Sequence, residues 1–215
     1  MKAYLELLEI MRARRSVRQF TDRPVERDDI LRLLEAARWA PSNHNRQPWR
    51  FLVIEDPTQI RQLAELVGHG LSERLKSLPG SAAHHAGDLT RHATFFAHAP
   101  VLLAVLHKQP VSLSARILAG LKNPELVSGE PLSGAMAVQN LLLAAQTLRL
   151  GTCVLTGPLL VQPALIEALV LPAGHELTCL VAVGHPAEAP AAPRRKTIDQ
   201  IVEFRNHPRV EQGLQ

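Results

Sequence analysis

The sequence contains few aromatic residues and few cysteines, and both shortages limit the possible protein classes. Aromatic residues make up 4% of the 215 positions, so aliphatic side chains and alanine must fill the core. The two cysteines, Cys153 and Cys179, show neither a CxxC pair nor zinc-ligand spacing, which disfavours a disulfide scaffold. Both lie in apolar, strand-like runs. Buried free thiols suit a reducing compartment, and we expect a cytoplasmic protein.

The sequence also lacks long hydrophobic runs and long basic runs. The apolar stretch 135–145 is interrupted by Gln139 and Asn140, and it is too short to cross a bilayer. The N-terminal residues have no signal-peptide core, so we expect no membrane contact. The net charge is +4, but basic and acidic residues are interspersed. We therefore expect no nucleic-acid partner.

Motifs of several enzyme classes are missing as well. There is no GxSxG, HExxH or P-loop, which leaves hydrolase and nucleotide-triphosphatase functions without support. His84, Asp88 and His92 are spaced four residues apart, as metal ligands on a helix can be. No further histidine continues this four-residue spacing on either side. We interpret the stretch as solvated or facing a lid, and we predict no metal site.

The first notable stretch that is present is RRSVRQF, residues 14–20. Arg14, Ser16 and Arg18 occupy alternate positions, so in an extended chain their side chains point to the same side. Two guanidinium groups and a hydroxyl on one side suit a dianionic phosphate. A lone stretch of this kind is usually an exposed basic turn. The phosphate interpretation gains support from the next stretch.

That second stretch is residues 41–47, between an expected helix and an expected strand. Pro41 and the following Pro48 stiffen it, and Ser42, Asn45 and Gln47 offer side-chain donors and acceptors. Any one of these polar residues could simply cap a helix or a turn. Taken together, we interpret residues 14–18 and 41–47 as two parts of one cofactor site, one for a phosphate and one for the polar edges of a ring or sugar.

Hydrophobic periodicity predicts a single α+β domain over residues 1–215. The expected helices cover 3–13, 27–40, 57–67, 131–149 and 163–169, and the expected strands cover 49–54, 100–106, 153–155 and 177–183. The helix at 131–149 is apolar nearly all round, so we expect it to be buried. Glycines and prolines interrupt 68–98 and 108–130. We expect these to be variable excursions that bound the substrate, with a short helix within 88–97.

Five stretches in order resemble the nitroreductase family, from about residue 11 to about residue 201. They are RRSVRQF, APSNHNRQPWRF (40–51), QNLLLAA (139–145), LGTCVLTG (150–157) and VGHP (183–186). The resemblance implies a central mixed β-sheet flanked by helices. It also implies a homodimer, with a C-terminal tail that reaches the partner subunit, and FMN as cofactor.

The resemblance further implies which residues bind FMN. Arg18 would place positive charge near the N1–O2 edge of the flavin, and residues 155–157 would cross one face of it. Thr156 stands where many relatives carry an acidic residue. The full set of expected cofactor-binding residues is Arg14, Arg15, Ser16, Arg18, Pro41, Ser42, Asn45, Gln47, Ser133, Leu155, Thr156, Gly157 and Arg195.

The implied activity is an FMN-dependent oxidoreductase. NADH or NADPH would reduce the flavin, and a nitroaromatic, quinone or related small-molecule acceptor would oxidise it in a ping-pong cycle. The chemistry is centred on the flavin, so no catalytic side chain is predicted. Two alternatives stay open. One is an FMN protein of the same fold with a reaction that does not use NAD(P)H, such as flavin fragmentation or substrate oxidation. The other is a non-enzymatic basic binding module.

Overall fold

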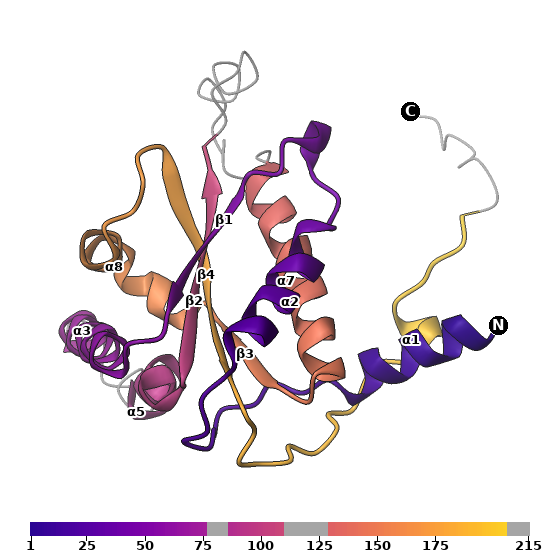
Figure 1. Ribbon diagram of the computed structural model, residues 1–215, viewed down its shortest axis with the longest axis horizontal. Coiled ribbons are helices and arrows are strands. Elements are labelled where there is room, and N and C mark those ends of the chain that lie inside the picture. The colour runs from indigo at the N-terminus through magenta and orange to yellow at the C-terminus, as the bar shows by residue number, and fades with distance from the viewer. Residues whose placement is uncertain (77–85, 110–128, 206–215) are drawn as a thin grey trace, which may run out of the picture.

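A computed structural model describes residues 1–76, 86–109 and 129–205 (Figure 1). Its centre is a sheet in the order β1-β2-β4-β3. The strands are β1 (Trp49–Ile54), β2 (Val101–Lys108), β3 (Gly151–Leu155) and β4 (His175–Gly184). All three strand pairings are antiparallel. The expected mixed sheet is therefore wrong for these strands. The parallel pairing in the described residues is one isolated bridge, between Ser16 and Thr152.

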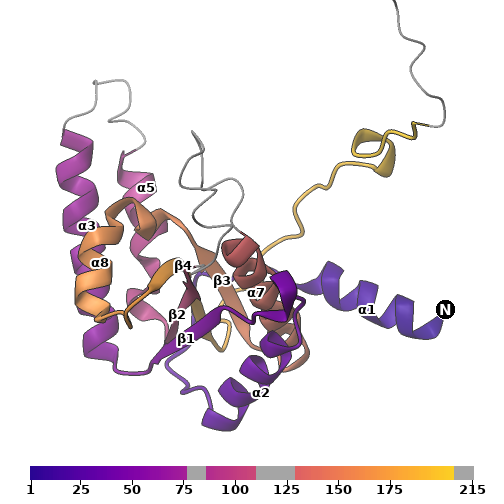
Figure 2. The ribbon, with the colours of Figure 1, turned by 90° about the horizontal axis from the view of Figure 1, so that it is seen from above.

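Helices cover both faces of the sheet (Figure 2). One face carries α2 (Arg27–Arg38) and α7 (Gly129–Thr147), and the other carries α3 (Pro57–Lys76), α5 (Ala86–Thr94) and α8 (Gln162–Leu169). Helix α1 (Lys2–Ala13) projects from the body and has no buried residue. The described residues also include the short 3₁₀ helices η1 (Asn43–Asn45), η2 (Phe95–His98), η4 (Gly157–Val161) and η5 (Ile198–Gln200). The predicted α+β class is confirmed.

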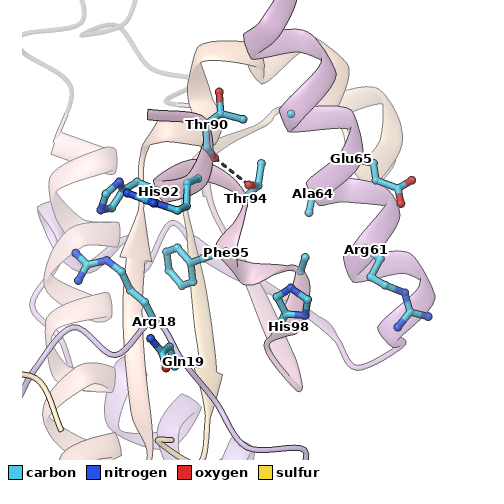
Figure 3. Close-up of a pocket in the computed structure, with 13 residues that line it drawn as sticks. Arg18, Gln19, Arg61, Ala64, Glu65, Thr90, His92, Thr94, Phe95 and His98 are labelled. Atoms are coloured by element: carbon cyan, nitrogen blue, oxygen red, sulfur yellow. Dashed lines mark hydrogen bonds between the residues drawn. The ribbon is translucent and has the colours of Figure 1, made fainter. Parts of the chain in front are cut away.

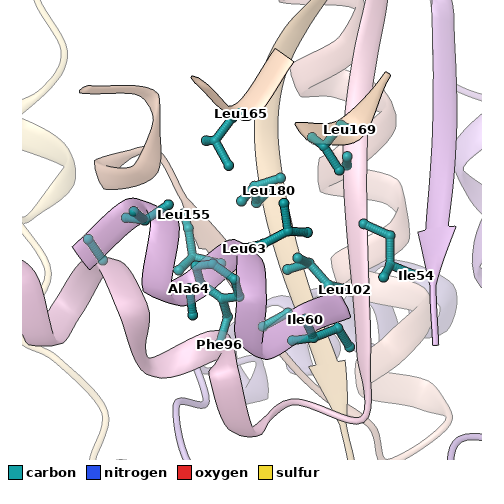
Figure 4. Packing of buried hydrophobic residues seen from close by; sticks show 14 of the residues in the cluster. Ile54, Ile60, Leu63, Ala64, Phe96, Leu102, Leu155, Leu165, Leu169 and Leu180 are labelled. Carbon is teal, nitrogen blue, oxygen red and sulfur yellow. The ribbon is translucent and has the colours of Figure 1, made fainter. Parts of the chain in front are cut away.

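Strand β2 contributes to two hydrophobic cores, one on each face of the sheet, because successive side chains of a strand face opposite sides. Leu102, Ala104 and Leu106 belong to the core under α3, α5 and α8, which Figure 4 shows from close by. Leu103 and Val105 belong to the core under α2 and α7. All five are 0% exposed, and burying a leucine side chain stabilises the fold by about 1.5–3 kcal/mol. A continuous apolar run correctly predicted this central strand.

Helix α3 does not end near residue 67, as we expected, but continues to Lys76. The two glycines in its second half do not break it. A Cβ atom at Gly70 would lie 2.6 Å from the Val161 side chain of η4, so the missing side chain lets the two elements approach closely. The expected excursion at 68–98 therefore contains the end of α3, α5 and η2. Most of the excursion at 108–130 lies outside the described residues.

Helix α7 is not buried all round. Leu132 and Met136, one helical turn apart, are 64% and 39% exposed. Beyond Pro190 the chain leaves the body as an arm, residues 191–204, and exposes Ile198, Ile201 and Phe204 (Figures 1 and 2). No helix in the described ranges is both long and apolar enough to span a membrane.

Candidate functional site

The segment 14–20 is extended and is attached to the edge of the sheet beside β3. The Val17 N–H donates to the Thr152 carbonyl at 3.0 Å, and Phe20 forms an antiparallel bridge with Pro186. Val17 is 6% exposed and packs inward. Since sides alternate along an extended chain, this orientation turns Ser16 and Arg18 to the opposite side. The expectation of an extended segment is confirmed.

The Cys153 thiol on β3 is influenced by Arg14, Ser16 and Arg18, although Arg14 and Arg18 line different cavities. Burial raises the pKa of the Cys153 thiol above its usual range. The positive charge of Arg18, the Ser16 hydroxyl and the charge of Arg14 lower that pKa, in this order of size. The negative charge of Glu188 acts in the opposite direction and raises the pKa of Cys153.

The guanidinium groups of the three arginines in this segment differ in their hydrogen-bond and ion-pair partners. Arg15 donates from its guanidinium to the backbone carbonyls of Arg12 and Arg14 at the end of α1. In the described parts of the chain, neither Arg14 nor Arg18 forms an ion pair with a carboxylate. Their two guanidinium groups and the Ser16 hydroxyl provide donors suited to a phosphate dianion. Arg15 has a structural role in this arrangement.

The loop 41–47 adopts an unusual conformation. His44, Asn45 and Gln47 have φ angles of 50°, 51° and 48°, in the left-handed region that non-glycine residues seldom enter. The Gln47 N–H donates to the Ser42 hydroxyl at 3.0 Å, which closes the loop. Such strain persists only where the surroundings enforce it, and it is concentrated at functional sites. Pro41, Asn45 and Gln47 are exposed.

The start of α7 holds this loop in place. The Asn43 N–H donates to the Ser133 hydroxyl at 3.2 Å, and the same hydroxyl donates to the Gly129 carbonyl at 2.7 Å. Arg46 donates to the carboxylate of Glu130, which is 3% exposed, at 3.1 Å. The sequence singled out Ser133 as a cofactor contact. Within one chain its hydroxyl is used to position the loop.

The two expected halves of the cofactor site lie at opposite ends of α7. The loop contacts this helix at Ser133, whereas Arg14 and Arg15 line a cavity of about 350 Å³ together with Gln146. Ser133 and Gln146 are thirteen residues apart on α7, which is about 20 Å along a helix. A single chain therefore does not bring the two halves together.

Residues 155–157 lie close to the Arg18 end of the segment. Leu155 ends β3 and is 3% exposed, and Thr156 precedes η4, which begins at Gly157 and has the proline Pro158 as its second residue. A Cβ atom at Gly157 would lie 3.1 Å from Ala93 on α5, so the chain passes tightly beside this helix. The same helix and Arg18 line a cavity of about 750 Å³ (Figure 3).

Arg195 is not near these groups. It is exposed and belongs to the arm that leaves the body. The sequence also gave no signal for Glu188, whose carboxylate accepts the backbone N–H groups of Arg18 and Gln19 at 2.6 and 3.1 Å. A lone glutamate in a proline-rich connector fits no motif, because its partners are backbone groups far away in the sequence.

The histidine spacing considered as a metal site has other contacts. Asp88 pairs with Arg91 at 2.6 Å, and the Nδ1 atom of His92 contacts the Asp88 carbonyl oxygen at 2.7 Å. His84 lies outside the described residues. Among the residues that are described, no cluster of three potential metal ligands occurs.

Comparisons with known proteins agree with the resemblance found in the sequence. Iodotyrosine deiodinase 1 of Rattus norvegicus is 30% identical over 204 residues, which cover 92% of this chain and 68% of that protein. A putative NAD(P)H nitroreductase, YfhC of Bacillus subtilis, is 26% identical over 199 residues, which cover 92% and 94% of the two chains. Both matches extend over nearly the whole of this chain.

A solved structure supports the fold. Oxidised iodotyrosine deiodinase bound to FMN and 3-iodo-L-tyrosine superimposes with a TM-score of 0.71 at 23% identity, and the match covers 94% of this chain and 99% of that one. The model of the nitroreductase family matches residues 11–185. That range includes both polar stretches and all four strands. The chain therefore belongs to the nitroreductase family.

Proposed function

We propose that this protein is a homodimeric, FMN-dependent oxidoreductase that uses NADH or NADPH to reduce a small-molecule acceptor. The observation that carries the proposal is the extended segment 14–18 beside β3, in which Arg14 and Arg18 form no ion pair in the described structure while the nearby Glu188 carboxylate accepts backbone N–H groups. The two guanidinium groups are at least partly open to solvent and can donate charge-assisted hydrogen bonds to an anion. A phosphorylated cofactor is the fitting ligand.

The roles of the residues follow from where they lie. Arg14 and Ser16 would bind the phosphate, and Arg18, which also borders the larger cavity, would lie at the polar edge of the ring. The backbone N–H of Gly157 would face the ring from the end of β3, since Pro158 has no N–H. Bound FMN would supply the redox chemistry, taking hydride from a nicotinamide and passing electrons to an acceptor. The protein itself binds, orients and excludes water.

A dimer would complete the site. The loop 41–47 is about 20 Å from Arg14 along its own α7, so a loop from a second copy is the natural source of Ser42, Asn45 and Gln47. Apolar side chains exposed on α1, α7 and the arm supply an apolar surface for that contact: Tyr4, Leu5, Leu132, Met136, Ile198, Ile201 and Phe204. Arg195, carried by the arm, could then reach the phosphate of the partner subunit.

Light scattering tests the dimer. We expect twice the chain mass, and we expect Ile201→Glu with Phe204→Glu to lower both the mass and the FMN content. Ile54 and the rest of the core are untouched by these exposed substitutions, so the fold should persist. A monomer that retains stoichiometric FMN would contradict the shared site.

The visible spectrum tests the redox function. We expect a yellow protein whose flavin absorption is bleached under anaerobic conditions by NADPH or NADH and returns when a nitroaromatic or a quinone is added. A colourless protein that takes up no FMN would reject both flavin functions and leave the basic binding module. The name of the Bacillus subtilis relative supports the NAD(P)H half of the cycle.

A second function has its own support, the 30% identity to iodotyrosine deiodinase 1 over 92% of this chain. In that case the flavin would take part in a reaction that does not use NAD(P)H. Bleaching by dithionite but not by NADPH, followed by recovery of the colour with 3-iodo-L-tyrosine, would favour reductive deiodination. Irreversible loss of the flavin spectrum in air would instead favour fragmentation of the flavin.

A further inference from the structure

A groove of about 750 Å³ lies between α3 and α5, beside the segment 14–20 (Figure 3). Its apolar lining comes from Ala64 on α3 and from Phe95 and Ala97 on η2. Phe95 is only partly buried, and its ring faces the groove between Arg18 and His98. An exposed aromatic face above small side chains suits a flat, apolar ring. The volume is in the range of small-molecule sites.

The rim of the groove is strongly basic. Arg18 borders one side and Arg61 and His98 border the other (Figure 3), and helix α5 contributes Arg91 and His92 to the lining.

One carboxylate, that of Glu65, belongs to the described lining. Arg91 is paired with Asp88, but Arg61 contacts only the Thr58 hydroxyl, at 3.4 Å, among the described residues. The Arg61 guanidinium is therefore available to an anion.

We propose that this groove binds a planar aromatic electron acceptor that carries one anionic group, such as a carboxylate. The ring would lie against Phe95, and the anionic group would lie toward Arg61 at the rim. This inference rests on the proposed function, because Arg18 is shared between the groove and the expected FMN site and would place the ring next to the flavin. It names a class of acceptor, aromatic and anionic, whereas flavin chemistry by itself does not restrict the acceptor.

Arg61 and Glu65 provide a charge test within one helix. They are four residues apart on α3, both exposed, and of opposite sign. Arg61→Gln removes the attracting charge and Glu65→Gln removes the opposing one. Neither residue belongs to the expected FMN contacts. Arg32→Gln, on α2 across the sheet and paired there with Asp29, removes the same charge at a position outside the groove.

The experiment measures binding by calorimetry, with protein as isolated and with protein saturated with FMN. The probes are 4-nitrobenzoate, uncharged nitrobenzene and cationic 4-nitrobenzylamine. We expect 4-nitrobenzoate to bind best. We expect its dissociation constant to rise roughly threefold to tenfold in Arg61→Gln and to fall in Glu65→Gln, since the charges are partly screened by solvent. Nitrobenzene should be insensitive to both, and Arg32→Gln should match the unchanged protein.

The kinetic counterpart is the oxidation of pre-reduced protein by the same three compounds, in which the KM for the anion should follow its dissociation constant. Equal affinity for all three probes, or an anion affinity that Arg32→Gln lowers as much as Arg61→Gln does, overturns the proposal. A change confined to NADPH, with 4-nitrobenzoate unaffected, also overturns it. These outcomes are distinct from failure of the proposed function, which is failure to bind FMN or to be bleached by NAD(P)H.

Discussion

The carboxylate of Glu188 accepts the backbone N–H of Arg18 at 2.6 Å across 170 positions of sequence. This contact joins the connector after β4 to the segment that carries the proposed phosphate ligands. It leaves the Arg18 guanidinium free while it fixes the backbone to which that side chain is attached. The connector continues into the arm, so the same residue lies between the proposed phosphate site and the proposed dimer contact.

Glu188→Ala should therefore weaken FMN binding without removing any direct ligand. Because the lost carboxylate accepts two N–H groups that fix the Arg18 backbone, the free energy of FMN binding should become less favourable by about 1–3 kcal/mol. Glu188→Gln keeps one acceptor oxygen and should recover most of the affinity. Titration of flavin-free protein with FMN measures both variants. Equal loss in the two would mean that the negative charge, rather than the hydrogen bonds, is what matters.

Arg14→Ala and Arg18→Ala should each weaken FMN binding by roughly tenfold to a hundredfold, because each removes a charge-assisted bond of about 1.5–3 kcal/mol. Arg15→Ala should have a smaller effect, since Arg15 donates to the backbone at the end of α1. The same FMN titration provides the comparison. Unchanged affinity in both Arg14→Ala and Arg18→Ala would remove the phosphate assignment.

Two neighbouring glycines of α3 should respond in opposite ways to alanine. At Gly68 the added Cβ would meet Thr94 at an ordinary 3.6 Å, so the gain in helix propensity should raise the unfolding midpoint by about 2–4 °C. At Gly70 the Cβ would lie 2.6 Å from Val161, and overpacking should cost about 1–3 kcal/mol. Thermal unfolding followed by circular dichroism measures both. Destabilisation of equal size would contradict the packing described between α3 and η4.

Phe95 and Phe96 are adjacent but should behave differently. Phe96 is 0% exposed in the core, so Phe96→Ala should destabilise the protein by about 3–5 kcal/mol. Phe95 lines the groove, and Phe95→Ala should instead change the ratio of rates between a nitroaromatic and a quinone while FMN affinity stays nearly constant. Stopped-flow oxidation of pre-reduced protein gives the ratio. If both rates fall by the same factor, Phe95 does not govern acceptor choice.

The buried His107 should make stability depend on pH. Its Nε2 atom lies 3.2 Å from Glu176 and its Nδ1 atom 2.8 Å from the Thr178 hydroxyl, which a neutral ring satisfies with one donor and one acceptor. Burial lowers the pKa of His107 below its ordinary 6.5, and this effect exceeds the opposing ones of Glu176 and Glu130.

The sign follows from proton counting. Between the lowered pKa of His107 and 6.5, the unfolded chain binds a proton that the folded protein does not. The stability is therefore fully present above about pH 6.5 and declines as pH falls through this window. Urea unfolding at about pH 7.5 and about pH 5.5 should show the decline, and it should be smaller in His107→Gln, which cannot titrate. An equal decline in both proteins would assign the effect to other groups.

Much of this protein could be read from its pattern of residues. Period-two alternation predicted that Arg14, Ser16 and Arg18 share a side, and a continuous apolar run predicted β2, because both are local consequences of strand geometry. The motif order predicted the family. The helix break at Gly68 was wrong, since glycine lowers helix propensity by only about 1 kcal/mol and the packing of α3 outweighs that cost.

Other features depended on contacts between residues distant in sequence, which only the tertiary structure could decide. The strained loop at 41–47 is held by Ser133 and Glu130, and Arg18 is positioned by Glu188. The roughly 20 Å between the two polar stretches arises because they pack at opposite ends of α7. Residue types and spacings determine which side chains can bind an anion. The packing of distant segments determines where those side chains meet. The direction of a side chain depends on its local backbone conformation, whereas the docking of helices and strands depends on residues far apart in the sequence.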